Sequence, residues 1–170
     1  MTTNSVQVDI AAAIVTELNA HAFSTKFTAK RQAGEINYEL KETSDVVVDV
    51  VPFSMKCKLG SRGTVDYTVV TSICIRKKIP SNEQGVDGWI PNAQVDPLFV
   101  LLQEINDYFI PSQDNGRSGR RLADAPEAAW VENTKENEDG IMGPYSKFLM
   151  EEKQFVGIVR VTYEVSRVPV

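Results

Sequence analysis

The most regular alternation of hydrophobic and polar residues lies at the end of the chain, over residues 155–168. Apolar side chains occupy every second position, Gly157 takes one of these positions, and polar side chains fill most of those between. The apolar set is Phe155, Val159, Val161, Tyr163 and Val165, and the polar set is Arg160, Thr162, Glu164 and Ser166. A period of two predicts a β-strand. Its apolar face needs a cover from elsewhere in the chain, and its other face is expected to face water.

Two segments have the apolar spacing of helices that could form this cover. Over residues 6–22 an apolar residue recurs at every fourth position, which predicts an amphipathic helix capped by Ser5 or a neighbouring residue. Over residues 98–109 the apolar residues recur at helical intervals, after Asp96 as a cap and Pro97 in the first turn. The apolar stripe of this second helix contains Leu98, Leu101, Leu102, Ile105, Tyr108 and Phe109.

A long β-hairpin is predicted between the helices, from two alternating segments at 45–58 and 64–79 joined by the turn sequence LGSRG. If the turn centres between Gly60 and Gly63, Val50 lies opposite Ile73 and Val48 opposite Ile75. Toward the tip the apolar residues share one face only if the first strand carries one extra residue, and Pro52 marks a bulge there. The apolar residues near the tip are Phe53, Met55 and Cys57 on the first strand and Val65, Tyr67 and Val69 on the second.

The same register separates the two cysteines of the chain. Cys74 pairs near Asp49, whereas Cys57 lies near the tip, about 30 Å away at about 3.3 Å per residue. A disulfide needs Cα atoms within about 7 Å, so none is expected within one subunit.

Shorter segments complete the expected fold. Residues 27–32 alternate as a strand that breaks at Gly34, residues 35–40 form a short extended piece, a strand begins at Trp130, and residues 145–154 form one or two helical turns. The order of elements predicts an α+β fold, with a mostly antiparallel β-sheet that contains the long hairpin and is covered on one face by two amphipathic helices. We expect one domain over residues 1–170.

Composition supports a globular domain and weakens a role in nucleic-acid binding. The chain has 170 residues, of which 42% are hydrophobic and 24% charged. Its formal net charge is -5, which argues against a dedicated DNA- or RNA-binding module. No window has the apolar length of a transmembrane helix, and the first residues lack the features of a signal peptide, so a cytosol-like compartment is expected.

The residues needed for catalysis are few. His21 is the only histidine, and its place at the end of the first helix favours capping over general-base catalysis. No serine lies in a GxSxG sequence, neither cysteine has an evident base, and the acidic run at 136–140 lacks the spacing of an EF-hand loop. We therefore predict no catalytic residue, metal or cofactor. A small hydrolase or transferase that uses Cys57 or carboxylates is the weaker alternative.

Three segments are candidates for contacts with other proteins. The irregular segment 80–94 holds Trp89 and Ile90 between turn residues, and exposed aromatic residues in loops favour contacts. The other candidates are basic: Lys56, Lys58 and Arg62 near the hairpin tip, and Arg117, Arg120 and Arg121 in the sequence RSGRR. The arginine segment fits a salt bridge to another subunit better than DNA binding, with the acidic residues 132–139 as a candidate counterpart. For each single residue a solvated turn is an equally good interpretation, except for Trp89.

The succession of these pieces resembles a known protein family. It runs from HAFSTKFTAKRQ at the end of the first helix, through VVVDVVP, GSRG and DYTVVTSICIRKKI in the hairpin, to VDPLFVLLQEINDYF in the second helix and YSKFLMEEKQFVGIVRVTYEVSR at the end. Together these residues, from about 6 to 168, resemble the tail terminator (tail-to-head joining) proteins of tailed bacteriophages. The segments 80–94 and 111–145 are longer than a minimal member of that family requires.

The resemblance implies a structural virion protein without catalytic residues. Such a subunit forms a ring, usually a homohexamer, which ends the polymerisation of the tail tube and presents its other side to the head-side neck or connector protein. The implied partners are thus other copies of the chain, the tube protein, the connector, and double-stranded DNA that passes through the lumen without specific binding; no membrane partner is implied. The implied location is the virion, after assembly in the host cytoplasm. A head-completion or stopper protein, a minor tail protein and a DNA-contacting accessory protein are the alternatives.

Overall fold

A six-stranded β-sheet is the centre of the computed structural model, which describes residues 5–33, 45–61, 63–132 and 140–168. The strand order is β1-β2-β3-β6-β4, and β5 also pairs with β6. The strands are β1 (Ala29–Arg31), β2 (Val47–Leu59), β3 (Val65–Lys78), β4 (Ala129–Val131), β5 (Ile141–Met142) and β6 (Gln154–Arg167). All pairs are antiparallel except β1 with β2. The predicted α+β class and mostly antiparallel sheet are confirmed.

The β2–β3 hairpin has the predicted register. Val50 lies opposite Ile73 and Val48 opposite Ile75, and the register shifts by one residue between Pro52 and Ser54. Beyond this bulge Met55 faces Val69 and Cys57 faces Tyr67. The bulge allows Pro52, which lacks a backbone N–H, to stand within a long strand.

One detail of the hairpin prediction is wrong. Phe53 does not lie on the same face as Met55 and Cys57, because it is the extra residue of the bulge. Its ring lies under the guanidinium of Arg160 at 3.8 Å, on the opposite face of the sheet. Neither cysteine forms a disulfide, and Cys74 stands opposite Asp49 whereas Cys57 stands opposite Tyr67, so the predicted separation of the two cysteines along the hairpin is confirmed.

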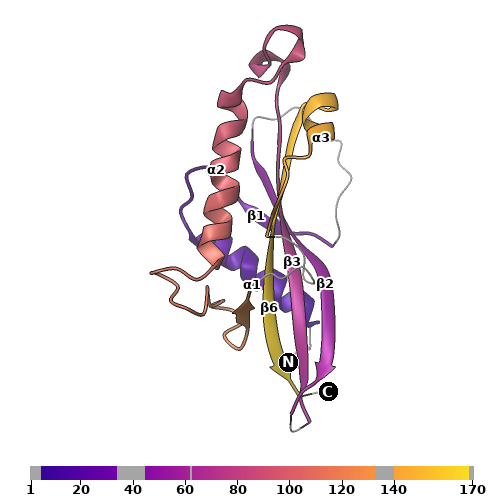
Figure 1. Ribbon diagram of the computed structural model, residues 1–170, viewed down its shortest axis with the longest axis vertical. Helices are drawn as coiled ribbons and strands as arrows, with labels where there is room; N and C mark the ends of the chain where they lie inside the picture. Colours follow the sequence, from indigo (N-terminus) through magenta and orange to yellow (C-terminus); the bar gives the residue numbers. More distant parts are fainter. Residues whose placement is uncertain (1–4, 34–44, 62, 133–139, 169–170) are drawn as a thin grey trace.

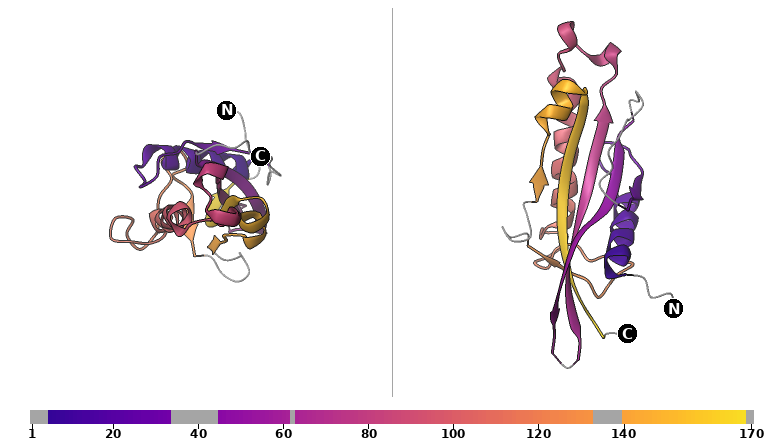
Figure 2. Two further views of the ribbon diagram at one scale, coloured as in Figure 1. Left: turned by 90° about the horizontal axis from the view of Figure 1, so that it is seen from above. Right: turned by 90° about the vertical axis from the view of Figure 1, so that its right-hand side faces the viewer.

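Two helices, α1 (Val6–Ala20) and α2 (Asn92–Phe109), cover one face of the sheet, as predicted (Figures 1 and 2). The helix α1 lies over β1, β2 and β3, and α2 lies over β6. Their apolar stripes meet the alternating apolar residues of the strands in one buried cluster. Its fully buried members include Ile10, Ile14 and Leu18 of α1, Leu101, Leu102 and Ile105 of α2, and Val48, Val50, Ile73, Ile75, Val159 and Tyr163 of the sheet.

The glycine among the apolar positions of β6 has a steric reason. A Cβ atom added at Gly157 would lie 2.6 Å from Cδ1 of Leu102, which is closer than carbon atoms can approach. Glycine at this position therefore lets α2 pack close to the strand. Gly157 faces Ile75 of β3, within the apolar face of the sheet.

The ends of the helices differ from the sequence prediction. The helix α2 begins at Asn92, not after Asp96, so Pro97 lies inside it. Val95 is buried one turn before Leu98, and burial of this added apolar residue offsets the hydrogen bond that Pro97 cannot make. Ser5 does occupy the N-cap position of α1, but its side chain makes no capping hydrogen bond.

The remaining short elements follow the prediction in part. Trp130 lies in β4, and the helix α3 (Ser146–Glu151) forms the predicted turns before β6. The strand predicted at 27–32 is reduced to β1 and is parallel to β2. The extended piece expected at 35–40 lies outside the described residues.

The second face of the sheet is less exposed than the alternation predicts. Arg160 and Thr162 were expected to face water, but both are buried, as are Ser72, Asp49 and Arg76. The charges are buried together with partners: Arg76 forms a salt bridge with Asp49, and Nε of Arg160 donates a 3.3 Å hydrogen bond to Oγ of Ser72. Pairing removes the main cost of burying them. A small apolar cluster of Val51, Cys74 and Ile158, with Tyr145 against it, lies on this face.

The subunit is elongated along its strands (Figure 1). The β2–β3 turn forms one end, and segment 80–91, with the short 3-10 helices η1 (Ser81–Glu83) and η2 (Val86–Gly88), forms the other (Figure 2). The strand β3 joins the two ends, and its 14 residues span about 46 Å at about 3.3 Å per residue. Features at the two ends are therefore too far apart to act on one small molecule.

Candidate functional site

The hairpin arm, which we define as residues 53–59 of β2 with the facing residues 65–70 of β3, extends beyond the helices (Figure 2). Two of its apolar side chains are exposed to solvent: the exposed fraction is 91% for Leu59 and 40% for Met55. The strand β1 pairs with β2 only as far as Val50, and no other described strand lies on that edge. An open strand edge with exposed apolar side chains is a typical site for protein association.

The predicted basic residues of the hairpin lie on this arm. Lys56 and Lys58 are exposed and occupy the face opposite Met55 and Leu59, since side chains alternate along a strand. They stand opposite Thr68 and Asp66 of β3. Arg62, the third predicted residue of this group, lies outside the described residues.

Trp89 lies at the other end of the subunit and is 60% exposed. The backbone holds it in a tight turn, in which the N–H of Gly85 donates a 2.6 Å hydrogen bond to the carbonyl of Trp89. Gly85 lies beneath the indole, and Val86 beside it is also exposed. Its neighbour Ile90 instead packs against the core. The turn is thus anchored by Ile90 and leaves Trp89 exposed.

The arginine loop, residues 110–128, places its three arginines in different surroundings. Arg117 and Arg121 are exposed, whereas Arg120 is directed into the subunit. The Nε atom of Arg120 lies 3.0 Å from Oε2 of Glu17, and its guanidinium stacks 4.3 Å from the ring centre of Tyr108. Arg120 therefore holds the loop in place, and Arg117 and Arg121 remain available to a partner.

Glu17 is the centre of this anchor and is a residue that the sequence analysis missed. Its buried carboxylate accepts hydrogen bonds from Oη of Tyr108 at 2.9 Å, Nε of Arg120 at 3.0 Å and the backbone N–H of Ala123 at 2.9 Å. A signal was present, because Glu17 stands three residues after Ile14 within the apolar stripe of α1. A carboxylate in such a stripe needs internal partners.

The environment of Glu17 changes its proton affinity. Burial acts to raise the pKa of the carboxyl group, but the hydrogen bonds from Ala123, Tyr108 and Arg120 and the charge of Arg120 outweigh burial and leave the pKa below its usual 4.5. Conversely, burial, the hydrogen bond to Glu17 and the charge of Glu17 raise the pKa of Tyr108. At neutral pH the pair is therefore a carboxylate with a neutral phenol, which suits a fixed structural contact.

His21 lies next to this anchor, at the C-cap position of α1. Its ring is 4.4 Å from that of Tyr108 and 4.6 Å from that of Phe23, between ring centres. The histidine is thus part of an aromatic cluster that joins α1 to α2. Within the described part of the chain, no group of three His, Cys, Asp or Glu residues could hold a metal ion.

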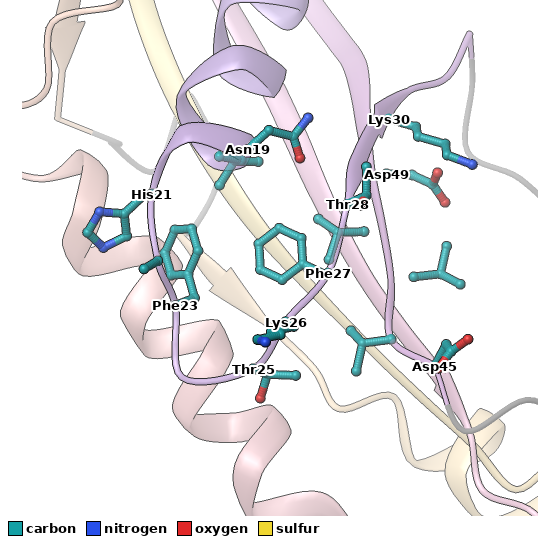
Figure 3. Close-up of a pocket in the computed structure, with 15 residues that line it drawn as sticks. Asn19, His21, Phe23, Thr25, Lys26, Phe27, Thr28, Lys30, Asp45 and Asp49 are labelled. Atoms are coloured by element: carbon teal, nitrogen blue, oxygen red, sulfur yellow. The ribbon is translucent and has the colours of Figure 1, made fainter.

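An open pocket of about 670 Å³ lies between the end of α1, the segment after it and the start of β2 (Figure 3). Phe23 and Phe27 line it, together with side chains of both charges. Two of its polar residues have structural partners: Asn19 makes two hydrogen bonds to the backbone of Ala29, and Asp49 pairs with Arg76. The pocket contains none of the predicted contact residues.

Comparison of the chain with models of known protein families and with curated proteins finds no match. Within the described residues, no helix is long and apolar enough to cross a membrane. The function is therefore inferred from the positions of the exposed surfaces. The predicted contact residues do not form one patch: they lie on the hairpin arm, on the Trp89 turn at the opposite end, and on the arginine loop.

Proposed function

We propose that this chain is the tail terminator of a tailed bacteriophage. Copies of it form a ring, most simply a homohexamer, at the head-proximal end of the tail tube. The ring stops the polymerisation of the tube and provides the surface on which the neck or head connector docks. In this proposal the protein is a structural component of the virion and converts no substrate.

The observation that carries the proposal is the separation of two exposed apolar sites along one elongated subunit. The hairpin arm with Leu59 forms one end, and the turn that contains Trp89 forms the other (Figure 1). A terminator needs such polarity, because one side of its ring must match the tube while the other side must not offer a second tube-like surface. A heterologous contact repeated by rotation closes into a ring, whereas one that does not close forms a filament.

The charge of the chain fits passage of a genome through the ring. A formal net charge of -5 limits the attraction of DNA phosphates to the subunit. Arg120 is engaged with Glu17, which leaves Arg117 and Arg121 as the exposed arginines of the loop. These observations favour passage of DNA through the ring and argue against DNA as a specific ligand.

The proposal is tested in the phage that carries the gene. Deletion of the gene should give tails of uncontrolled length by electron microscopy, and the purified protein should form ring-shaped particles alone or with tube. Normal tail lengths in the deletion mutant would refute the proposal. Binding to purified tube and to portal-side components separates a terminator from a stopper, because a stopper binds the portal side without capping the tube.

A further inference from the structure

An open groove lies on one flank of the subunit. Its larger part is the pocket of about 670 Å³ beside β1, which is the edge strand of the sheet. A second pocket of about 200 Å³ shares residues 25–26 and 45–46 with the first and continues to the start of α2. We call the two pockets together the flank groove; residues 18–30, residues 45–49 and the start of α2 bound it.

The wall of the flank groove is aromatic. The rings of Phe23 and Phe27 stack with 5.3 Å between their centres, and both rings line the larger pocket (Figure 3). Both side chains are only half-buried, although they pack against the core. Aromatic pairs gain attraction from their ring geometry as well as from the area they bury, so this wall suits a further aromatic side chain.

The unpaired charges of the flank groove are positive. Lys26 and Lys30 line it, are exposed and form no ion pair within the described part of the chain. Two carboxylates also line it, but Asp49 pairs with Arg76, and Asp45 is likewise engaged within the chain. A partner that brings an aromatic side chain and a carboxylate would therefore match the groove.

The Trp89 turn, residues 85–89, has this composition. Trp89 and Val86 are exposed, and Asp87 between them is exposed as well. Asp87 forms no ion pair with any residue that the structure describes. The whole segment 80–91 contains no lysine or arginine. The turn is thus a convex, aromatic and acidic surface, whereas the groove is concave, aromatic and basic.

The turn of the same subunit does not enter the groove. None of residues 85–89 lines either pocket. The 2.6 Å hydrogen bond from the N–H of Gly85 to the carbonyl of Trp89 holds the turn at the end of the subunit (Figure 1). A turn at one end and a groove on one flank are different surfaces, so a contact between them joins two copies head to tail. Such a contact closes a ring when its rotation closes.

We infer that the Trp89 turn of one subunit docks in the flank groove of a second copy. The indole of Trp89 packs on the rings of Phe23 and Phe27, and the carboxylate of Asp87 lies toward Lys26, which lines both pockets of the groove. This inference rests on the proposed ring assembly and names the surfaces that join neighbouring subunits. It leaves the hairpin arm as the exposed apolar end of each assembled subunit, as a ring with one tube-binding side requires.

Charge reversal tests the polar part of the contact. Lys26→Glu should raise the concentration at which half of the subunits are assembled by at least about tenfold, because it places two carboxylates together. Adding Asp87→Lys should restore assembly; the left-handed backbone of Asp87, with φ of 61°, suits a lysine, since Lys153 adopts φ of 53°. Lys147→Glu, at an exposed position of α3, is the matched control and should have no effect. Sedimentation velocity measures assembly, and circular dichroism shows that each variant is folded.

Fluorescence measures burial of the indole directly. The chain has two tryptophans, Trp89 and Trp130. The emission of the wild type should shift to shorter wavelength as the concentration rises through the range of assembly. Trp89→Phe keeps an aromatic ring in the turn and leaves Trp130 as the only emitter, so it should show no shift. Rings that form without a shift in the wild type would overturn the contact.

A cross-link identifies the two surfaces that meet. Cys57→Ser removes the exposed thiol, and Cys74 is buried. Val86→Cys and Thr25→Cys are then added together, one in the turn and one in the groove. A short bismaleimide should join the subunits into a ladder of covalent multimers on denaturing electrophoresis, because a head-to-tail contact uses both sites of every subunit. Either added cysteine alone should give no ladder.

The outcomes separate the failures. Rings that form with neither the ladder nor the emission shift overturn docking of the turn in the groove and leave the terminator proposal standing. An emission shift that appears only after purified tube or connector is added assigns the turn to that partner and likewise overturns the contact between copies. A wild-type chain that is monomeric at high concentration and within finished particles overturns both proposals.

Discussion

Arg120 and Glu17 are 103 residues apart in the chain, and Nε of Arg120 lies 3.0 Å from Oε2 of Glu17. The same carboxylate binds Tyr108 of α2 and the backbone of Ala123. One side chain therefore ties α1, α2 and the arginine loop together. Because the partners include a cation and a phenol, the contact is stronger than a hydrogen bond between neutral groups.

Replacing the carboxylate should loosen this anchor. Glu17→Gln retains the size of the side chain but removes its charge and one acceptor, and we expect the free energy of unfolding to fall by about 1–3 kcal/mol. Urea titration followed by circular dichroism measures the change. Asp124→Asn is the control, since this exposed carboxylate of the same loop should alter stability by less than about 0.5 kcal/mol. Equal effects of the two variants would contradict the anchor.

The depressed pKa of Glu17 also predicts a pH dependence of stability. A carboxyl group whose pKa is lower in the folded state stabilises the fold fully above its unfolded pKa, and this contribution disappears as the pH falls through the folded value. The wild type should thus lose stability below about pH 4.5 more steeply than Glu17→Gln, with the two curves converging in acid. Parallel curves from pH 7 to pH 2 would show that the pKa of Glu17 is not lowered by folding.

The buried pair of Asp49 and Arg76 predicts an asymmetry between single and double variants. Asp49→Ala should destabilise the fold by about 3–5 kcal/mol, because it leaves a buried guanidinium without its carboxylate. The double variant Asp49→Leu, Arg76→Met replaces both charges with apolar groups and should recover most of this loss. Chemical denaturation of the wild type, Asp49→Leu, Arg76→Met and the double variant gives the coupling, and additive losses would argue against pairing.

Gly157 predicts a steric conflict that a second change relieves. Gly157→Ala should cost about 1–3 kcal/mol, because the new methyl group meets Leu102. Leu102→Ala alone should cost about 2–5 kcal/mol by opening a cavity. The double variant should be more stable than the sum of the two losses allows, as thermal unfolding would show. An additive double variant would mean that the cost of Gly157→Ala does not come from contact with Leu102.

Trp89 predicts a separation between folding and assembly. Trp89→Ala should change the free energy of unfolding by less than about 1 kcal/mol, because the indole is largely exposed. It should nevertheless reduce tail capping when supplied to the deletion mutant, since large aromatic residues dominate interfaces. Electron microscopy of tail lengths measures the capping. Ile90→Ala is the contrasting variant and should lower the free energy of unfolding, because Ile90 packs on the core. Full capping by Trp89→Ala would remove this turn from the contact surfaces.

The hairpin shows which structural features a local sequence pattern can predict. Alternation within two adjacent strands, joined by a short glycine turn, was enough to predict that Val50 faces Ile73 and that a bulge follows Pro52. These features depend on contacts between two strands that follow one another in the sequence. The side of Phe53 was not predictable in this way, because Arg160 of a distant strand provides its partner.

The candidate contact residues show the same limit. Arg117, Arg120 and Arg121 look alike in the sequence, yet only Arg120 pairs with Glu17. Which arginine turns inward depends on where α1 lies relative to the loop. Trp89 is exposed, as expected for an aromatic residue between turn residues. Ile90, the other candidate of this segment, instead packs against the core.

The sequence by itself determined the two hairpin strands, the final strand, the two covering helices and the register of the hairpin, because period and turn chemistry act over a few residues. The tertiary structure alone decided that the polar face of β6 is buried, that Glu17 anchors a loop from the other half of the chain, and that the arm and the Trp89 turn stand at opposite ends. A buried charge depends on partners that folding brings together. The residue type alone does not show whether a polar side chain will be hydrated or paired with an arginine.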